Sequence, residues 1–241
     1  MLSKRIQRMI TLLRKNFKRL LLRHVTVLFI ALVLTLPFWW GRLNWDPEMR
    51  LWRAIGDSSF LLLVFTLTIG PLARLWPTIN PLVAWRREAG IWYGLLALVH
   101  TVLIFAGWAR WDILRFLGYE YVPQLERYAR IEPGFGLANL MGLIAMAITL
   151  LLVGTSANWA LNRLGASAWK WLQYGAYSVF YLVVLHTAYF LFMHYTVSFH
   201  RSVPDELNWF SYPFLTLAIS VPILQTLAFF KTVRRQSETS K

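Results

Sequence analysis

Two of the five histidines lie deep within long apolar stretches of the sequence. At a helical rise of about 1.5 Å per residue, His100 lies about 18 Å along its predicted helix from Glu88. By the same measure, His186 lies about 25 Å along its predicted helix from Trp169. Ionisable side chains at such depth in a membrane are costly, so these two imidazoles are the first candidates for a functional role.

Two imidazoles at matching depth on different helices suit a haem iron held by two axial ligands. The sequence contains no cysteine, which excludes disulfides, iron–sulfur clusters and thiolate metal sites. No carboxylate is predicted within the membrane beside His100 or His186, so few other metal sites can be built there. The residues alone leave a second reading open, in which each histidine only bonds a neighbouring helix.

Small side chains accompany both histidines and would let a helix or a flat macrocycle approach closely. Those predicted near the His100 face are Gly90, Gly94, Ala97 and Thr101, and those near the His186 face are Gly175 and Ser178. The other histidines, His24, His194 and His200, fall near predicted helix ends, where interfacial roles are common, and their roles stay open.

The elements that must position these residues are transmembrane helices. The chain has 241 residues, of which 57% are hydrophobic and 15% charged, with a mean hydropathy of +0.47. A soluble domain of this size cannot bury so much apolar surface. The stretches long enough to cross about 30 Å of hydrocarbon are Leu20–Trp40, Ser58–Trp76, Glu88–Trp108, Gly136–Ser156, Trp169–His194 and Tyr212–Phe230.

The sequence therefore predicts an all-α polytopic membrane protein, a six-helix bundle with a haem between its third and fifth helices. The bundle is expected to form one transmembrane domain over residues 20–230, followed by a cytoplasmic tail, 231–241. A basic segment, 1–19, precedes it and is either an amphipathic helix on the membrane surface or an ordinary basic flank.

Charge placement predicts the orientation of the bundle. Six spans put both termini on one side, and 17 of the 25 Lys and Arg residues lie on that side. The positive-inside rule then places the termini in the cytoplasm and the protein in the inner (plasma) membrane. The net charge of +14 is explained by topology and by membrane lipid headgroups, and no nucleic-acid partner is expected because the basic residues flank the spans.

Several short motifs, in matching order and spacing, carry a resemblance that covers about Gly56 to His186. They are Gly56-Asp57, Gly70 to Arg74, Arg86 to Gly90, Leu98 to His100, Thr155-Ser156, Arg163 to Gly165, Trp169 to Gln173 and Leu185-His186. In these the chain resembles the ferric reductase-like transmembrane family, and within it the haem-binding membrane subunit of the periplasmic methionine sulfoxide reductase system.

The resemblance implies a b-type cytochrome with His100 and His186 as haem ligands. It also implies an electron donor, a cytoplasmic reduced flavin such as FMN or a flavin reductase, and an acceptor, a periplasmic molybdopterin-dependent sulfoxide reductase. The chain departs from the family at Gln173, where a further histidine is common. One haem is therefore expected and two stay possible, and one outer haem leaves a gap of about 20 Å along the helix to the cytoplasmic face.

Arginines on both predicted faces are candidate anion sites. Arg74, Arg86 and Arg87 gather at the cytoplasmic face, where they suit a flavin phosphate or a haem propionate, or else only fix the topology. On the outer face, Arg110 and Arg115 could meet the propionates of an outer haem. The outer loop over residues 109–135 could cover the haem edge, dock a periplasmic partner or serve as a plain connector.

Other function classes remain as alternatives. The chain has no G-x-G-x-x-G or P-loop motif, so it is expected to need an external electron donor, as an electron-transfer subunit of an oxidoreductase system. A stand-alone ferric or quinone-linked reductase would use the same arrangement. A transporter would instead show acids or broken helices at mid-membrane, and a structural subunit without haem is the remaining alternative.

Overall fold

The computed structural model of the protein describes residues 2–130, 133–194 and 208–239. Six of its helical segments are long and apolar enough to cross a membrane: Phe17–Trp40, Pro47–Leu75, Arg86–Trp108, Gly134–Gly154, Ala166–Met193 and Ser211–Thr239. The prediction of an all-α polytopic chain with six transmembrane helices is confirmed.

The long helices alternate with short connecting helices. The long ones are α1 (Leu2–Trp40), α2 (Pro47–Leu75), α4 (Arg86–Leu103), α6 (Pro133–Gly154), α9 (Gly175–Ala188) and α10 (Ser211–Thr239). The short ones are α3 (Asn80–Val83), α5 (Ile113–Phe116), α7 (Asn158–Leu164) and α8 (Ala166–Gln173). Helix α1 continues without a break from the predicted basic segment into the predicted first span.

Two spans change their pitch directly after the candidate histidines. A π-helical turn, Ile104–Trp108, continues α4 and begins four residues after His100. A second π-helical turn, Tyr189–Met193, continues α9 and begins three residues after His186. Turns of this kind occur often at functional sites. Both histidines are thus followed by a π-helical turn, which the apolar sequence around them does not predict.

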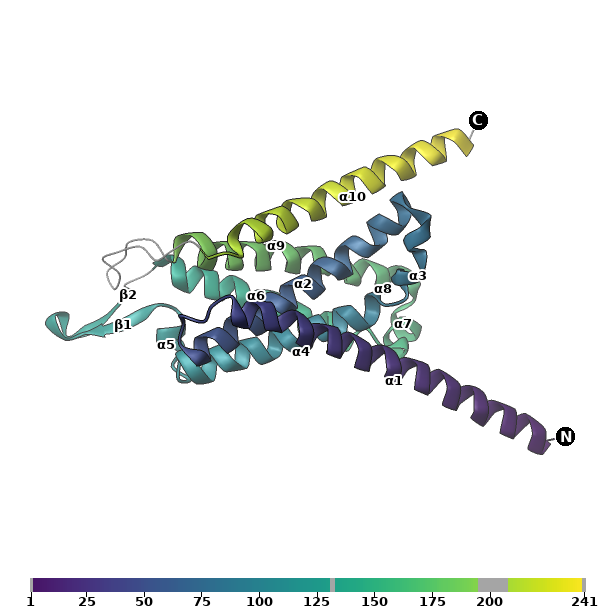
Figure 1. The fold of residues 1–241 in the computed structure, drawn as a ribbon, viewed down its shortest axis with the longest axis horizontal. Coiled ribbons are helices and arrows are strands. Elements are labelled where there is room, and N and C mark those ends of the chain that lie inside the picture. Colours follow the sequence, from purple (N-terminus) through teal and green to yellow (C-terminus); the bar gives the residue numbers. More distant parts are fainter. Residues whose placement is uncertain (1, 131–132, 195–207, 240–241) are drawn as a thin grey trace.

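The long outer connection contains a small antiparallel sheet. Strands β1 (Tyr119–Val122) and β2 (Arg127–Arg130) pair with Tyr121 opposite Tyr128, and a 3-10 turn, Pro123–Leu125, joins them. Another 3-10 turn, Pro77–Ile79, follows α2. The sheet projects from one end of the bundle, called here the hairpin end (Figure 1).

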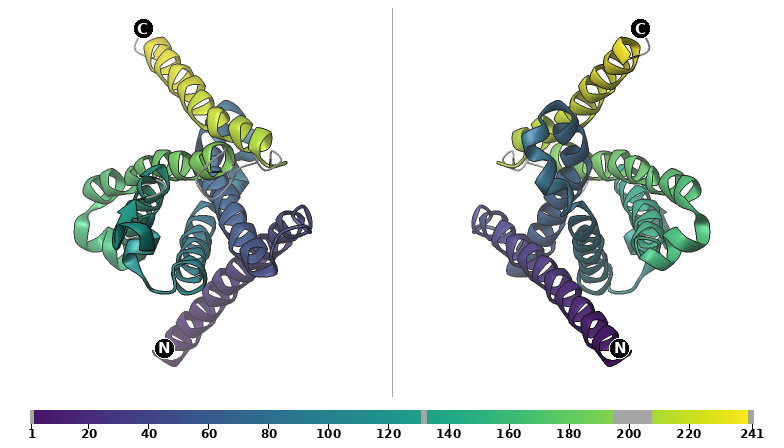
Figure 2. Two further views of the ribbon diagram at one scale, coloured as in Figure 1. Left: turned by 90° about the vertical axis from the view of Figure 1, so that its left-hand side faces the viewer. Right: turned by 90° about the vertical axis from the view of Figure 1, so that its right-hand side faces the viewer.

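Both described chain ends lie at the opposite end of the bundle, called here the terminal end (Figure 1). Views along the bundle show α1 and α10 diverging there on opposite sides, while α6 and α9 lie together on one flank (Figure 2). Helix α2 packs against α1, α4 and α10. It is the most buried span, because 56% of its most apolar stretch is buried inside the structure, compared with 11% for the first span. The centre of the bundle is therefore α2.

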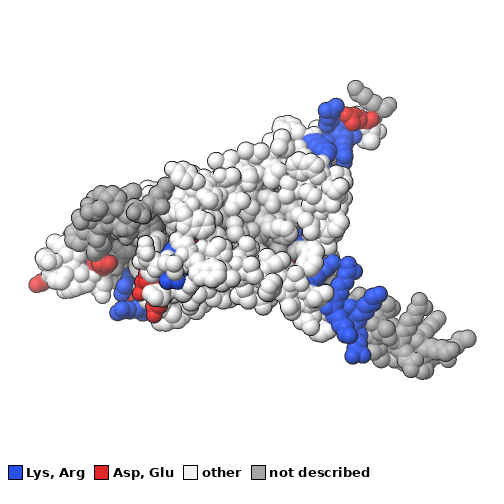
Figure 3. Space-filling model, in the orientation of Figure 1, with Lys and Arg blue, Asp and Glu red and all other residues white. Residues whose placement is uncertain are grey.

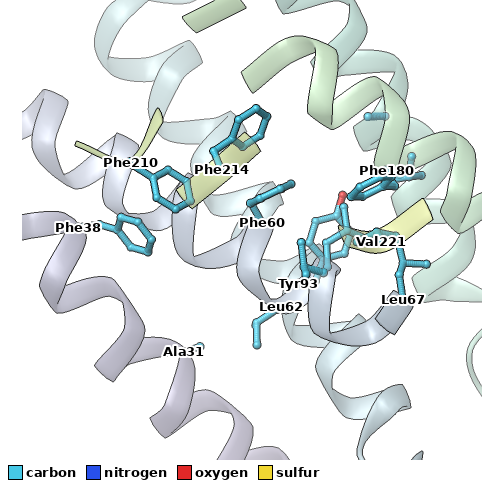
Figure 4. Close-up of a cluster of buried hydrophobic side chains, with 14 of the residues drawn as sticks. Ala31, Phe38, Phe60, Leu62, Leu67, Tyr93, Phe180, Phe210, Phe214 and Val221 are labelled. Carbon is cyan, nitrogen blue, oxygen red and sulfur yellow. The ribbon is translucent and has the colours of Figure 1, made fainter. Parts of the chain in front are cut away.

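An aromatic core holds α1, α2 and α10 together (Figure 4). Phe60 of α2 packs against Phe214 of α10 with ring centroids 5.1 Å apart, and Phe38 of α1 meets Phe210 edge-on at 4.8 Å. Phe60 and Phe214 are fully buried. Because such rings bury large apolar areas, this cluster stabilises the packing of α1 and α10 against α2. Helix α2 in turn packs against α4, which carries His100.

The charges of the molecule gather at its two ends. Lys and Arg cover the terminal-end parts of α1 and α10, both signs occur near the hairpin end, and the visible middle of the molecule is almost free of charge (Figure 3). An uncharged belt between charged ends is what a bilayer-spanning bundle requires. Which end faces the cytoplasm remains a prediction from the sequence.

Helix α2 begins well before the predicted residue Ser58. Asp46 caps it by accepting hydrogen bonds from the backbone N–H groups of Glu48 and Met49, and Pro47 takes the first helical position. Arginines of this charged stretch lie on aromatic rings, such as Arg50 at 4.2 Å from the Trp39 ring, which lets the charged residues pack within the bundle. The predicted boundary was wrong because hydropathy does not register this pairing.

Candidate functional site

A cavity between α2, α4, α6 and α9 contains both candidate histidines. It comprises about 1160 Å³ of space free of protein atoms, of which part is open to solvent. Side chains from all four helices line it, among them His100 of α4 and His186 of α9. The structure thus brings together the two imidazoles that the sequence placed at similar depth.

Both imidazoles are held by a backbone carbonyl of a neighbouring helix. His100 Nδ1 lies 2.8 Å from the carbonyl oxygen of Trp52 in α2, and His186 Nδ1 lies 2.7 Å from that of Ala138 in α6. Since a carbonyl only accepts, Nδ1 carries the proton and donates in each case. In the neutral imidazole, the Nε2 atom of each ring is then unprotonated and available as a metal ligand, the arrangement that fixes ligating histidines in metalloproteins.

This donor set fits a haem. Among the described residues, no three His, Cys, Asp or Glu side chains come together as a metal site. Two neutral imidazoles supply two ligands, so the remaining positions of a six-coordinate iron need another source, and the four nitrogens of a macrocycle provide one. His100 and His186 would hold that iron, and the cavity between their helices would receive the ring.

Aromatic side chains close the cavity toward the hairpin end. The lining there includes Trp108, Phe116, Phe135 and Phe190. The outer loop is fastened over it because the Asn139 amide donates to the carbonyl of Phe116 at 2.8 Å. Phe116 and Phe135 of the outer loop therefore line this end of the cavity, whereas its strands β1 and β2 project from the bundle (Figure 1).

Closely packed helices bound the cavity toward the terminal end. Tyr93 of α4 lines it and shares a hydrogen bond of 3.2 Å with Thr149 of α6. One residue further, a methyl group placed on Gly94 would lie 2.6 Å from a methyl carbon of Val153. Helices α4 and α6 are thus in direct contact here.

Gln173 does not line the cavity. Its amide lies 3.5 Å from the carbonyl of Leu152 and 3.4 Å from the Thr155 hydroxyl, at the terminal end of α6. The Gln173 side chain, at the position where the resemblance implied a histidine, therefore contacts the end of α6 instead.

Comparison with known proteins places this arrangement in a family. The sequence model described as ferric reductase like transmembrane component matches residues 55–184. This chain belongs to the ferric reductase-like transmembrane family. A relative from Yersinia pseudotuberculosis serotype O:1b (strain IP 31758), named protein-methionine-sulfoxide reductase heme-binding subunit MsrQ, is 32% identical over 183 residues, which cover 70% of this chain and 80% of the relative. A Yersinia pestis (strain Pestoides F) protein of the same name is also 32% identical, with 79% of its length covered.

The three arginines predicted at the cytoplasmic face, Arg74, Arg86 and Arg87, do not line the cavity of this ferric reductase-like chain. Arg74 and Arg86 are exposed, and Arg86 reaches toward α2, where a methyl group on Gly70 would lie 3.6 Å from its Nη1 atom. Arg87 is exposed too but donates to the Asn158 side chain of α7 at 3.0 Å. Arg86 and Arg87 therefore contact two different helices, α2 and α7.

At the hairpin end, a different arginine from those predicted reaches the cavity. Arg53 of α2 lines it, with its guanidinium 4.9 Å from the Phe190 ring. Arg115 instead lies over Trp108 at 5.4 Å, and Arg110 is exposed in a left-handed backbone conformation. Arg53 was missed because α2 was predicted to begin after it.

The prediction that no carboxylate lies beside the histidines was wrong. Asp57, which directly precedes the predicted second span, is buried within α2 and lines the cavity with His100. It forms an ion pair with the buried Arg42 at 2.5 Å. The sequence does not indicate that Asp57 is buried, because its partner Arg42 lies fifteen residues earlier, in the connection after α1.

The remaining histidines separate clearly. His194 lines the cavity, with its ring centroid 5.3 Å from that of Phe135. The site therefore contains a third imidazole. His24 is half-buried on α1 and does not line the cavity. His200 lies outside the described residues.

Of the small residues predicted around the histidines, Ala97 and Thr101 line the cavity. Gly90 and Gly94 contact α2 and α6 instead, and Ser178 is exposed. The glycines that lie against the histidine rings are Gly56 and Gly142, on the facing helices, and neither was predicted to lie near a histidine.

Proposed function

We propose that this chain is a b-type haem protein that carries electrons across the plasma membrane, with both termini in the cytoplasm. Its electron donor is reduced FMN or a flavin reductase on the cytoplasmic side, and its acceptor is a periplasmic methionine sulfoxide reductase. The observation that carries the proposal is the pairing of His100 and His186 across one cavity with both Nε2 atoms available. The names of the relatives and the family itself support it.

The residues of the chain have separate tasks in this proposal. His100 and His186 bind the iron, and the carbonyls of Trp52 and Ala138 fix the tautomer and the plane of each ring. When bound, a b-type haem supplies one-electron chemistry through its iron. The aromatic rings at the hairpin end give this part of the site an apolar lining, which lowers its local dielectric.

Charged groups at the hairpin end of the cavity suit the acidic part of the cofactor. Arg53 and His194 both line the cavity there. A guanidinium matches a carboxylate in shape and charge, and an imidazole can donate a hydrogen bond to one. We therefore assign the propionate groups to this end of the site.

Electron input is assigned to the terminal end, where Arg74 and Arg86 are exposed. We expect Arg86→Ala to raise the concentration of reduced FMN needed for half-maximal haem reduction by about 10-fold, since one charge-assisted hydrogen bond contributes about 1.5 kcal/mol. The measurement is stopped-flow haem reduction in membrane vesicles of known orientation, with Arg163→Ala, an exposed arginine of α7, as the control. Equal effects of the two substitutions would remove Arg86 from the proposed flavin site.

We also propose that the chain binds a single haem. Gln173 is held against the end of α6, and α4 and α6 are in contact on the terminal side of the cavity. Gln173→His is therefore expected to leave the haem content at one per chain, measured by pyridine haemochrome against protein. A rise to two haems per chain would show that the histidine alone creates an inner site.

A further inference from the structure

The two candidate ligands lie directly against glycines of neighbouring helices. A methyl group placed on Gly56 of α2 would lie 3.0 Å from His100 Nδ1, and one on Gly142 of α6 would lie 2.8 Å from His186 Nδ1. In each case the three nearest heavy atoms all belong to the histidine ring. The imidazole is thus the nearest neighbour of the space that each glycine leaves.

The register of these glycines explains the hydrogen bonds of the rings. The carbonyls that accept from the histidines belong to Trp52 and Ala138, each four residues before a glycine. In an α-helix, the carbonyl of residue i bonds the N–H of residue i+4, whose Cβ tilts back toward that carbonyl. A side chain at i+4 therefore covers the oxygen from outside, and a glycine leaves its second lone pair open.

We propose that Gly56 and Gly142 are positioning residues that set the orientation of the two imidazoles. Without a side chain at these positions, each ring can approach the helix closely enough for its Nδ1–H group to reach a carbonyl already used by the helix. The same device occurs in the pairs α2 with α4 and α6 with α9. The binding consequence rests on the proposed function, whereas the contact between glycine and ring does not.

Other glycines of the same helices serve as matched controls. A methyl group on Gly70 of α2 would meet only Arg86 Nη1, at 3.6 Å, and one on Gly154 of α6 would have no neighbour within 4 Å. Alanine at Gly70 or Gly154 therefore tests the loss of a helix glycine without disturbing a histidine. Any general effect of replacing glycine in these helices appears in both sets.

The first experiment compares haem binding by Gly56→Ala and Gly142→Ala with Gly70→Ala and Gly154→Ala. Loss of a hydrogen bond to a ligating histidine lowers metal affinity about 10- to 100-fold, so this loss is expected for the first pair alone. Gly142→Ala should have the larger effect because its contact is shorter. Any haem retained should show an altered low-spin EPR spectrum and a raised midpoint potential, since a less basic imidazole stabilises the ferric state less. Unchanged affinity and spectra in Gly142→Ala would overturn the proposal.

The second experiment tests the contact without haem. Gly142→Ala is introduced into wild type and into His186→Ala, and thermal unfolding of the full chain prepared without haem is measured for all four proteins. If the added methyl meets only the ring, its destabilising effect disappears when the ring is removed. An effect that persists undiminished in His186→Ala would show that Gly142 serves helix packing instead. Because this cycle needs no haem, a failure of the proposed function would leave it interpretable.

Discussion

Replacing either His100 or His186 with alanine is expected to yield a membrane-inserted protein that purifies without haem. In the proposed site each imidazole would supply one ligand to the iron, and both rings line the same cavity with their Nδ1 atoms bonded to carbonyls. Loss of a ligand itself should exceed the effect of losing a ligand's hydrogen bond, so haem affinity should fall by more than about 100-fold. Haem titration of the purified variants, followed by absorbance, measures this loss.

The control for these variants is His24→Ala, because His24 is half-buried on α1 and does not line the cavity. It should keep the wild-type haem content. His194→Ala is informative as well, since His194 does line the cavity. If His186→Ala retained six-coordinate haem and His194→Ala lost it, the assigned ligand would be wrong and the third imidazole would take its place.

The second large effect is expected on stability rather than on binding. Arg42 and Asp57 form a buried ion pair at 2.5 Å, in which the Arg42 guanidinium also lies 5.4 Å from the Trp45 ring. Arg42→Ala would leave a buried carboxylate unpaired, which costs about 3–5 kcal/mol. For a chain of this size the thermal unfolding midpoint should fall by roughly 6 to 20 °C, measured on the purified protein in detergent.

The double substitution Arg42→Met with Asp57→Leu separates the ion pair from packing. Among the described residues, Arg42 Nε and Nη1 have no hydrogen-bond partner, so the pair is incompletely satisfied. Replacing both charges with apolar side chains should therefore restore most of the lost stability. Glu238→Ala, which removes the exposed ion pair with Arg234, should change the midpoint little. A single Arg42→Ala variant as stable as wild type would contradict this account of the pair.

The sequence was sufficient to predict six spans and to single out His100 and His186, whose rings line one cavity in the structure, for a common physical reason. Lipid demands long apolar helices, so hydropathy marks them without knowledge of packing. The same medium penalises buried imidazoles, which makes His100 and His186 stand out. Both signals depend on residues within a single helix, so they can be recognised without knowing how the helices pack.

What the sequence did not reveal depends on contacts between helices. Arg53 and Asp57 lie outside the predicted spans, and the sequence does not show that Arg53 lies beside an aromatic ring or that Asp57 pairs with Arg42. The sequence does not indicate that Gly56 and Gly142 lie beside histidines. Their proposed role follows only from the structure, in which the rings of His100 and His186 lie against them. Small residues were sought on the helices that carry the histidines, whereas the structure places the decisive ones on the facing helices.

The measurement that tests the central claim most directly is the reduced-minus-oxidised absorbance spectrum of the wild-type protein, combined with haem quantification and EPR of the oxidised state. The account predicts one b-type haem per chain, with a low-spin ferric signal typical of two imidazole ligands. A protein that carries no haem even when expressed with excess haem, or a haem with only one imidazole ligand, would contradict it.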